Sequence, residues 1–303
     1  MAGNRLVIVG SMALDDIKTP FGEARDALGG TATYAGIAAS LFSDVSLIAV
    51  VGADFPREHI TFLNKRGIDT RGVKIAPGKT FRWSGVYEYD MAQAHTLKTE
   101  LNVYVDFFPE IPDGLASSEY VFLANIDPKL QIHVMSKIGG AKFSALDTMN
   151  LWIGGSREKL VEAIGKVDAV FINDAEVRQL CKTHNLVKGA KTILGMGPEF
   201  VVVKKGEHGA LLFSREGVFS APAFPLEDVV DPTGAGDSFA GGAMGWVTRT
   251  GDVSEKNLRK AVIYGSAVAS FNAEHFGAGK LKEISLHEVE ERVERLCALS
   301  RLD

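Results

Sequence analysis

Residues 229–242 read Val-Val-Asp-Pro-Thr-Gly-Ala-Gly-Asp-Ser-Phe-Ala-Gly-Gly, a stretch that predicts an apolar strand joined to a helix through small residues. Side chains are nearly absent at Gly234, Ala235 and Gly236, so their backbone N–H groups can closely approach a ligand. Unpaired donors and the helix dipole favour negative charge at a helix N-terminus. The stretch therefore predicts an anion site.

Asp237 follows these small residues directly, and a carboxylate is an unexpected neighbour for an anion. Its charge costs electrostatic energy when a phosphate binds, which makes sense if it faces the group that attacks the phosphate. The alternative is an acidic residue that only stabilises the start of a helix after a glycine turn. Residues elsewhere in the chain decide between the two interpretations.

Three further motifs accompany residues 229–242. They are Gly29-Gly30 before the small-residue segment 31–40, Asn173-Asp174-Ala175-Glu176 after the apolar strand 169–172, and Lys204-Lys205-Gly206-Glu207-His208-Gly209 after another strand. In kind and in order, the four motifs resemble those of the ribokinase or PfkB family of sugar and nucleoside kinases. They are spread over nearly the whole chain.

The resemblance implies phosphoryl transfer from ATP, which asks a protein mainly for positioning and charge neutralisation. It assigns Asp237 as the base that deprotonates an acceptor hydroxyl and residues 234–236 as the anion hole for the moving phosphoryl group. It also implies that Asn173 and Glu176 organise the phosphates and Mg²⁺, with Glu176 reaching the ion through water. Alternatively, Asn173 caps the following helix and Glu176 completes a capping box.

The resemblance places four more residues beside the nucleotide: Lys204, Gly206, Gly209 and Ser266. For the lysine, the alternative is a solvated strand end, because two lysines precede the glycine there. Asp231 and Thr233 match positions that hold a monovalent cation, such as K⁺, in some relatives. A role in stabilising the turn is the rival interpretation for this pair.

On the acceptor side, the resemblance implies that Asp15 hydrogen-bonds sugar hydroxyls, with its neighbour Asp16 as the competing candidate. Gly29 and Gly30 belong to the motif that binds the acceptor. Asn125 follows the apolar segment 120–124, and we expect it to reach the same site.

Tyr34 departs from the family pattern. Many members have Gly-Gly-x-x-x-Asn, with asparagine at the position that Tyr34 occupies here. A phenol offers fewer hydrogen-bonding groups than an amide, so the acceptor contact must differ. Tyrosine at this position is similar to some cyclitol kinases of the family. The alternative is that Tyr34 only fills the core.

Short apolar segments alternate with amphipathic ones, and this alternation predicts an α/β fold: a doubly wound, mainly parallel sheet sandwiched by helices. Strands are expected near 5–10, 45–51, 120–124, 143–147, 169–172 and 200–204, and helices near 31–42, 57–66, 128–138, 157–165, 174–183, 236–249, 255–272 and 286–299. Ligands bind beyond the carboxyl ends of such strands. Asp15, Asn125, Asn173 and the turn at 231–237 all follow strands in this interpretation.

Residues 81–106 break the alternation and predict a hairpin, because their side chains follow a period of two. Phe81, Trp83, Tyr87 and Tyr89 share one face, and Leu97, Leu101, Val103 and Val105 again fall on one side. A second hairpin is expected at 17–28, and the two ribbons are expected to form one small sheet. The resemblance implies a lid over the site that also serves as a dimer surface in some members. Core padding is the alternative.

The composition fits an enzyme of one ribokinase-like domain over residues 1–303. The chain has 46% hydrophobic residues, and its 33 basic and 38 acidic residues give a net charge of −5, which disfavours nucleic acid and anionic membranes as partners. Its two cysteines lack metal-ligand spacing, and no apolar run approaches membrane-spanning length. We expect a cytoplasmic protein.

These observations favour an ATP- and Mg²⁺-dependent kinase that phosphorylates a hydroxyl of a small polyol, most simply a sugar. A nucleoside or a cyclitol such as inositol is the alternative acceptor, and aromatic side chains of the lid are suited to stacking on a base. The remote alternative is a catalytically silent binding protein on the same fold. Asp237, Asn173 and Glu176 together argue against it.

Overall fold

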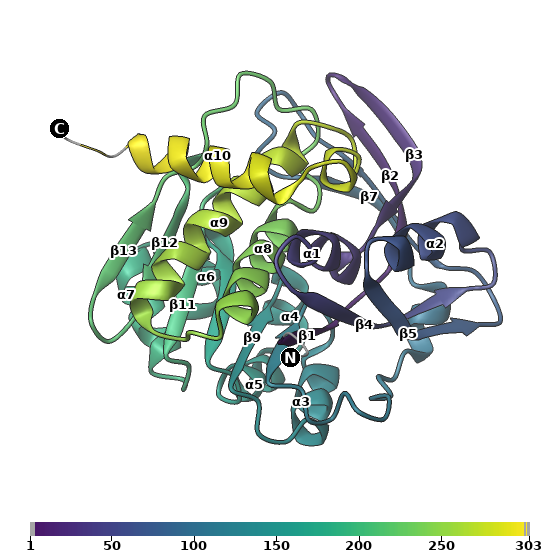
Figure 1. The fold of residues 1–303 in the computed structure, drawn as a ribbon, viewed down its shortest axis with the longest axis horizontal. Helices are drawn as coiled ribbons and strands as arrows, with labels where there is room; N and C mark the ends of the chain where they lie inside the picture. The colour runs from purple at the N-terminus through teal and green to yellow at the C-terminus, as the bar shows by residue number, and fades with distance from the viewer. Residues whose placement is uncertain (1–3, 300, 302–303) are drawn as a thin grey trace.

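The computed structural model describes residues 4–299 and 301, and its centre is a nine-stranded sheet with the order β13-β12-β11-β10-β9-β8-β1-β4-β5 (Figure 1). The bounds are β1 Arg5–Val9, β4 Asp44–Gly52, β5 Ile68–Ala76, β8 Tyr120–Leu123, β9 Phe143–Asp147, β10 Ala169–Asn173, β11 Phe200–Lys204, β12 Ala210–Phe213 and β13 Val218–Ala221. Neighbours from β11 to β5 pair in parallel, and β12 and β13 extend the sheet in antiparallel fashion.

Helices cover both faces of this sheet. They are α1 Thr31–Ala39, α2 Arg57–Lys65, α3 Pro128–Lys137, α4 Asn150–Gly155, α5 Arg157–Ile164, α6 Asp174–Cys181, α7 Leu186–Leu194, α8 Ala235–Thr250, α9 Glu255–Ala273 and α10 Leu286–Ala298. Figure 1 shows α1, α8 and α9 side by side on one face. Leu6 and Ile8 of β1 join the core on that face, whereas Val7 and Val9 join a second core under α3 to α7, because successive strand side chains point to opposite faces. The doubly wound prediction is confirmed.

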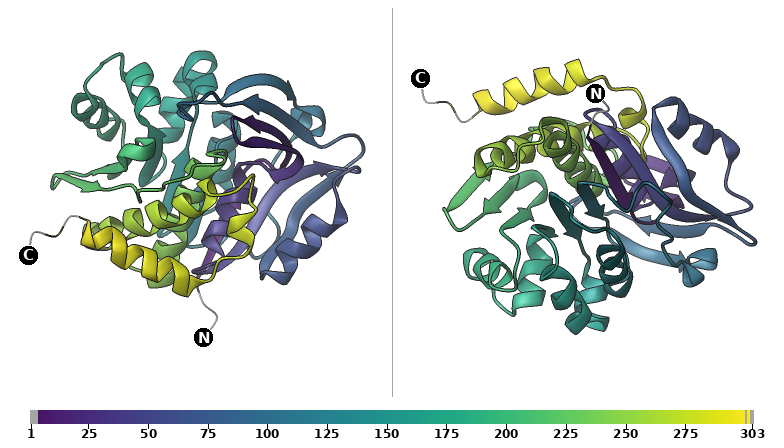
Figure 2. Two further views of the ribbon diagram at one scale, coloured as in Figure 1. Left: turned by 90° about the horizontal axis from the view of Figure 1, so that it is seen from above. Right: turned by 60° about the horizontal axis from the view of Figure 1, so that its bottom comes forward.

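A second, four-stranded sheet has the order β3-β2-β6-β7. Its strands are β2 Ala13–Thr19, β3 Gly22–Gly29, β6 Phe81–Val86 and β7 His95–Glu100. β2 pairs with β3 in antiparallel fashion and with β6 in parallel, so the two predicted ribbons do form one sheet. Its purple and blue strands lie together in both views of Figure 2. That this sheet acts as a lid stays a prediction, as does the single-domain assignment.

The predicted apolar face of the second ribbon is wrong for Tyr89, which is 86% exposed, and for the later half of the ribbon. Leu97, Leu101 and Val105 are exposed to 65%, 45% and 68%. β7 ends at Glu100, and Asn102, at φ +50°, begins the 3-10 helix η1 (Asn102–Asp106). The left-handed backbone of Asn102 ends the extended period of two.

Two expectations about the site's surroundings also need correction. Residues 222–234, between β13 and α8, contain no strand, so Val229 and Val230 do not form the apolar strand expected before the helix. Instead, the N–H groups of Val230 and Asp231 both donate to the carbonyl of Ala273 at the end of α9. Asp15 lies within β2 of the small sheet, rather than in a loop after β1.

Among the helices of the described chain, none is long and apolar enough to span a membrane.

Candidate active site

The turn that begins α8 is built around Gly234, which caps the helix in the left-handed conformation at φ +76°. A Cβ at this residue would lie 2.5 Å from the ring of Tyr34, so both the backbone and the close packing require glycine. Asp231 shapes the same turn: its Oδ1 accepts the N–H of Thr233 at 2.9 Å, and its Oδ2 accepts the N–H of Gly277 at 2.7 Å. The turn-stabilising interpretation of Asp231 is thus confirmed, whereas a monovalent cation at Asp231 and Thr233 stays a prediction.

Asp237 lies in the first turn of α8 and is half-buried. Burial raises the pKa of its carboxyl to about 7, with Asp147 raising it further and Lys204 opposing the rise. A carboxyl that titrates near neutral pH holds a proton well enough to act as a base and is still largely free of one at physiological pH. The protonation chemistry of Asp237 therefore suits its predicted role.

Three neighbouring parallel strands end in polar residues at the same edge of the sheet: β9 in Asp147, β10 in Asn173 and β11 in Lys204. Lys204 Nζ lies 2.5 Å from Asp147 Oδ2, and the side chains are 15% and 3% exposed. Although burial opposes charge on the lysine, Asp147 and Glu176 hold the pKa of Lys204 above its usual value. Asp147 was missed from the sequence, although it ends the predicted strand 143–147 just as Asn173 ends its own strand.

Asn173 and Glu176 form a capping box at the start of α6, as the alternative interpretation predicted. Asn173 Oδ1 accepts the N–H of Glu176 at 2.8 Å, and Glu176 Oε2 accepts the N–H of Asn173 at 3.0 Å. Burial raises the pKa of Glu176 to about 7, and Lys204 opposes the rise. The capping box fixes both side chains at the edge where β10 ends, so it does not compete with their predicted role.

The donor set fits Mg²⁺ that is carried by phosphates and retains water. Within residues 4–299 and 301, no group of three or more His, Cys, Asp or Glu side chains is placed to hold a metal by itself. Glu176 is 7% exposed, and each of its oxygens already accepts a hydrogen bond from Asn173. A carboxylate has further lone pairs, and Mg²⁺ commonly keeps several waters while one or two carboxylates hold it. Contact through water is therefore the arrangement that these residues allow.

Asp15 reaches the same region from the small sheet. It is 4% exposed, and burial, together with Asp231 and Asp237, raises its pKa to about 8. A Cβ added to Gly29 would lie 1.9 Å from Asp15 Oδ2, so this glycine of the acceptor motif leaves room for the carboxyl group. Gly30 forms the N-cap of α1 beside it. The structure thus brings Asp15, Asp231 and Asp237 into electrostatic contact.

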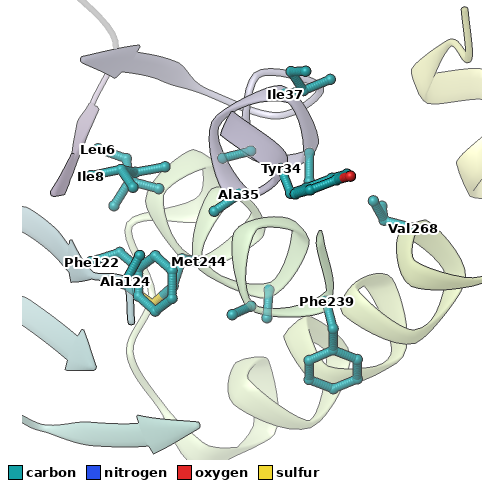
Figure 3. Close-up of a cluster of buried hydrophobic side chains, with 14 of the residues drawn as sticks. Leu6, Ile8, Tyr34, Ala35, Ile37, Phe122, Ala124, Phe239, Met244 and Val268 are labelled. Atoms are coloured by element: carbon teal, nitrogen blue, oxygen red, sulfur yellow. The ribbon is translucent and has the colours of Figure 1, made fainter. Parts of the chain in front are cut away.

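Tyr34 projects from α1 into the core between α1 and α8 and is only 1% exposed (Figure 3). Its ring packs directly against Gly234. Its hydroxyl is buried, and no hydrogen-bond partner for it is found within the described residues. Packing is therefore one role of Tyr34, and an acceptor contact through the unpaired hydroxyl stays a prediction.

The other predicted residues are placed as follows. Asn125 accepts a hydrogen bond from Trp152 Nε1 at 2.8 Å. Ser266 is buried in α9 and donates to the carbonyl of Pro222 at 2.8 Å. Gly206 and Gly209 lie in the loop that joins β11 to β12. These contacts hold the loops around the site together, and binding by these four residues stays a prediction.

Tyr87 was assigned from the sequence to the aromatic face of the lid, and its contact with the turn before α8 was not predicted. Thr233 Oγ1 lies 3.2 Å from Tyr87 Oη, which joins the small sheet's edge to the turn before α8. Tyr87 is 8% exposed, and burial raises its pKa to about 12. Its place in the aromatic face of the predicted hairpin was the available signal.

The family model described as pfkB family carbohydrate kinase matches residues 14–284, which include every element around the turn. The chain belongs to this family. It is therefore a kinase, and the resemblance seen in its motifs is confirmed.

This kinase is similar to a cytidine kinase of Thermococcus kodakarensis, with 29% identity over 250 residues that cover 80% of this chain and 88% of the relative. In fold it is similar to a nucleoside kinase of Methanocaldococcus jannaschii, described as an archaeal member of the ribokinase family, with a TM-score of 0.78 and 22% identity over 97% and 100% of the chains. A putative ribokinase II from E. coli, solved with ATP and Mg²⁺, matches with a TM-score of 0.79 and 19% identity over 96% and 99%.

Proposed function

We propose that this kinase transfers the γ-phosphoryl group of ATP to a hydroxyl of a nucleoside. The observation that carries the proposal is the half-buried Asp237, with a pKa of about 7, directly after the turn of residues 234–236. That pairing puts a base next to the backbone N–H groups of Gly234 and Gly236 at the start of a helix, where an anion is favoured. The N–H of Ala235 instead donates to the carbonyl of Pro232 at 3.1 Å.

In the proposed reaction, a carboxylate oxygen of Asp237 takes the proton of the acceptor hydroxyl. The hydroxyl oxygen forms the new bond to the γ-phosphorus, and the bond from that phosphorus to the bridging oxygen breaks, so the electron pair leaves with ADP. The N–H groups of Gly234 and Gly236 bind the oxygens of the phosphoryl group as it moves. Mg²⁺, when bound, neutralises charge on the phosphates.

The remaining residues orient the two substrates in this proposal. Asn173 and Glu176, fixed by their capping box, face the phosphates and the hydrated ion. Lys204 and the loop of Gly206 and Gly209 border the nucleotide. Asp15, which lies in β2 of the small sheet and is buried beside the turn, binds hydroxyls of the acceptor.

A nucleoside takes precedence over the free sugar that the sequence favoured, because the cytidine kinase relative matches most of both chains. A free sugar is the second candidate acceptor, since the matching family model is described as pfkB family carbohydrate kinase. Both acceptors present a ring with several hydroxyls, which is what the carboxyl group of Asp15 can recognise.

An ADP-release assay with the full chain, ATP and Mg²⁺ tests the proposal. The acceptor panel is cytidine, adenosine, inosine, ribose, fructose and myo-inositol, and the product is identified by ³¹P NMR. We expect the highest kcat/KM with a nucleoside, and a kcat lowered by roughly a hundredfold or more in the Asp237→Asn variant. A preference for ribose or fructose by tenfold or more overturns the nucleoside assignment, and full activity in the variant overturns the role of Asp237.

A further inference from the structure

Lys204 and Asp147 form an ion pair at the carboxyl edge of the sheet, on either side of β10. Asn173 is the register partner of Lys204 across β10 and β11, and Asp147 pairs with Phe171 across β9 and β10. The pair therefore spans the strand that carries the capping box of Asn173 and Glu176.

Burying such a pair is costly, because both charges lose water, and replacing it by apolar residues is often neutral or stabilising. The side chains are 15% and 3% exposed, so most of that cost applies here. The fold by itself therefore gives little reason to place a lysine at this position.

Lys204 Nζ faces the turn that begins α8. A Cβ added to Gly236 would lie 3.2 Å from this nitrogen. The glycine therefore lets the ammonium group lie close to the backbone of the turn. An ammonium group has three N–H donors. Within the described part of the chain, Asp147 Oδ2 is the one acceptor found for them.

We propose that Lys204, held in position by Asp147, is the cation that binds the transferred phosphoryl group beside the N–H groups of Gly234 and Gly236. The inference rests on the proposed function, since it assigns the charge that the anion site needs. Lys204 is a catalytic residue in this proposal, and Asp147 is a positioning residue that acts through it.

The charges around Lys204 explain why both Lys204 and Asp147 are needed at the site. Asp147, Glu176 and Asp237 are all in electrostatic contact with the lysine. Without Lys204, the phosphates of ATP would approach three carboxyl groups. Without Asp147, the ammonium group would be free to bind Asp237 directly and would hold its carboxylate away from the acceptor hydroxyl.

Four variants separate this role from a structural one: Lys204→Met, Lys204→Arg, Asp147→Asn and the double variant Lys204→Met with Asp147→Asn. Lys188→Met, which removes an exposed lysine on α7, is the matched control. For each variant, kcat and KM are measured with the best acceptor. Calorimetry gives the affinity for adenosine, ADP and the non-hydrolysable β,γ-imido analogue of ATP, so that phosphate binding is read without turnover. The acceptor site is saturated with the best acceptor in these titrations, so that adenosine reports on the nucleotide site.

We expect Lys204→Met to lower kcat by roughly a hundredfold or more, as for the loss of one donor from an anion hole. Affinity for the ATP analogue should fall tenfold or more, while affinity for adenosine stays within twofold. The arginine variant should recover part of both losses. The double variant removes both members of the ion pair, so it should regain part of the thermal stability that Lys204→Met loses, without regaining kcat.

Two results overturn the inference. One is kcat and analogue affinity within threefold of the native values in Lys204→Met. The other is an equal loss of affinity for adenosine and for the analogue, with kcat restored in the double variant, which assigns the pair to structure alone. If the native protein phosphorylates no acceptor on the panel, the proposed function fails, but the comparison of adenosine with the analogue still tests the phosphate contact of Lys204.

Discussion

Tyr87 and Thr233 lie 146 residues apart in sequence, and their hydroxyl oxygens lie 3.2 Å apart at the boundary between the small sheet and the turn before α8. This contact ties the proposed lid to the residues that would hold the phosphoryl group. We therefore predict that movement of the proposed lid and the order of the turn are coupled through this hydrogen bond.

Tyr87→Phe keeps the ring and removes only this bond. A hydrogen bond of this kind contributes about 0.5 to 1.5 kcal/mol, so we expect the KM for the acceptor to rise by roughly 2- to 12-fold, with little change in Tm. Hydrogen exchange with and without acceptor should show faster exchange over residues 81–86 in the variant. Identical exchange in both proteins would show that the contact does not govern the lid.

Asp237→Asn removes the proposed base with almost no change in size. We expect kcat to fall by roughly a hundredfold or more, while ADP affinity is retained. Because the pKa of Asp237 is about 7, the native kcat/KM should decline as the pH falls below 7, where the carboxyl takes up a proton. A profile that is flat from pH 5 to 8 would contradict this assignment.

Asp15→Asn tests the convergence of carboxyl groups beside the turn. Burial raises the pKa of Asp15 to about 8, so the folded protein holds this proton more tightly than the unfolded chain does. The resulting stability is fully present below about pH 4 and is lost as the pH rises towards 8. Each such proton contributes about 1.4 kcal/mol per pH unit in that window.

The native protein should therefore melt at a lower temperature at pH 8 than at pH 6, and Asp15→Asn should reduce this difference. Thermal unfolding followed by circular dichroism at both pH values measures it. An unchanged difference would show that Asp15 is ionised in the folded protein at pH 6.

Tyr34→Phe removes the buried hydroxyl that lacks a partner and keeps the ring under Gly234. If the hydroxyl contacts the acceptor, the ranking of acceptors should change while the KM for ATP stays constant. Stability should be equal or higher by up to about 1 kcal/mol, because a buried unpaired group is removed. Tyr34→Asn is the matched comparison. Loss of the ring in that variant should lower the free energy of unfolding by about 2 to 4 kcal/mol. An unchanged acceptor ranking in the phenylalanine variant would leave Tyr34 with packing alone.

The sequence predicted the inner strands and the motif-bearing turns because their signals are local: strands such as 169–172 are apolar throughout, and glycine marks the turns. It did not predict β5, because its Arg71 and Lys74 interrupt the apolar run of this outer strand. The contact between Asp147 and Lys204 was equally out of reach, since a pairing across 57 residues depends on strand order. Val229 and Val230 misled because their irregular segment is held to the end of α9 by backbone hydrogen bonds from Val230 and Asp231 to Ala273, and not by a neighbouring strand.

The ring of Tyr34 lies against Gly234, so the turn that we propose binds phosphate is completed by a residue made 200 positions earlier. During synthesis, one side of α1 stays uncovered until α8 has left the ribosome, since α8 packs along it. A nascent chain that stops before residue 234 therefore lacks the proposed phosphate-binding turn. The same long-range closure makes catalytic competence a late event in folding, reached when both ends of the polypeptide have come together.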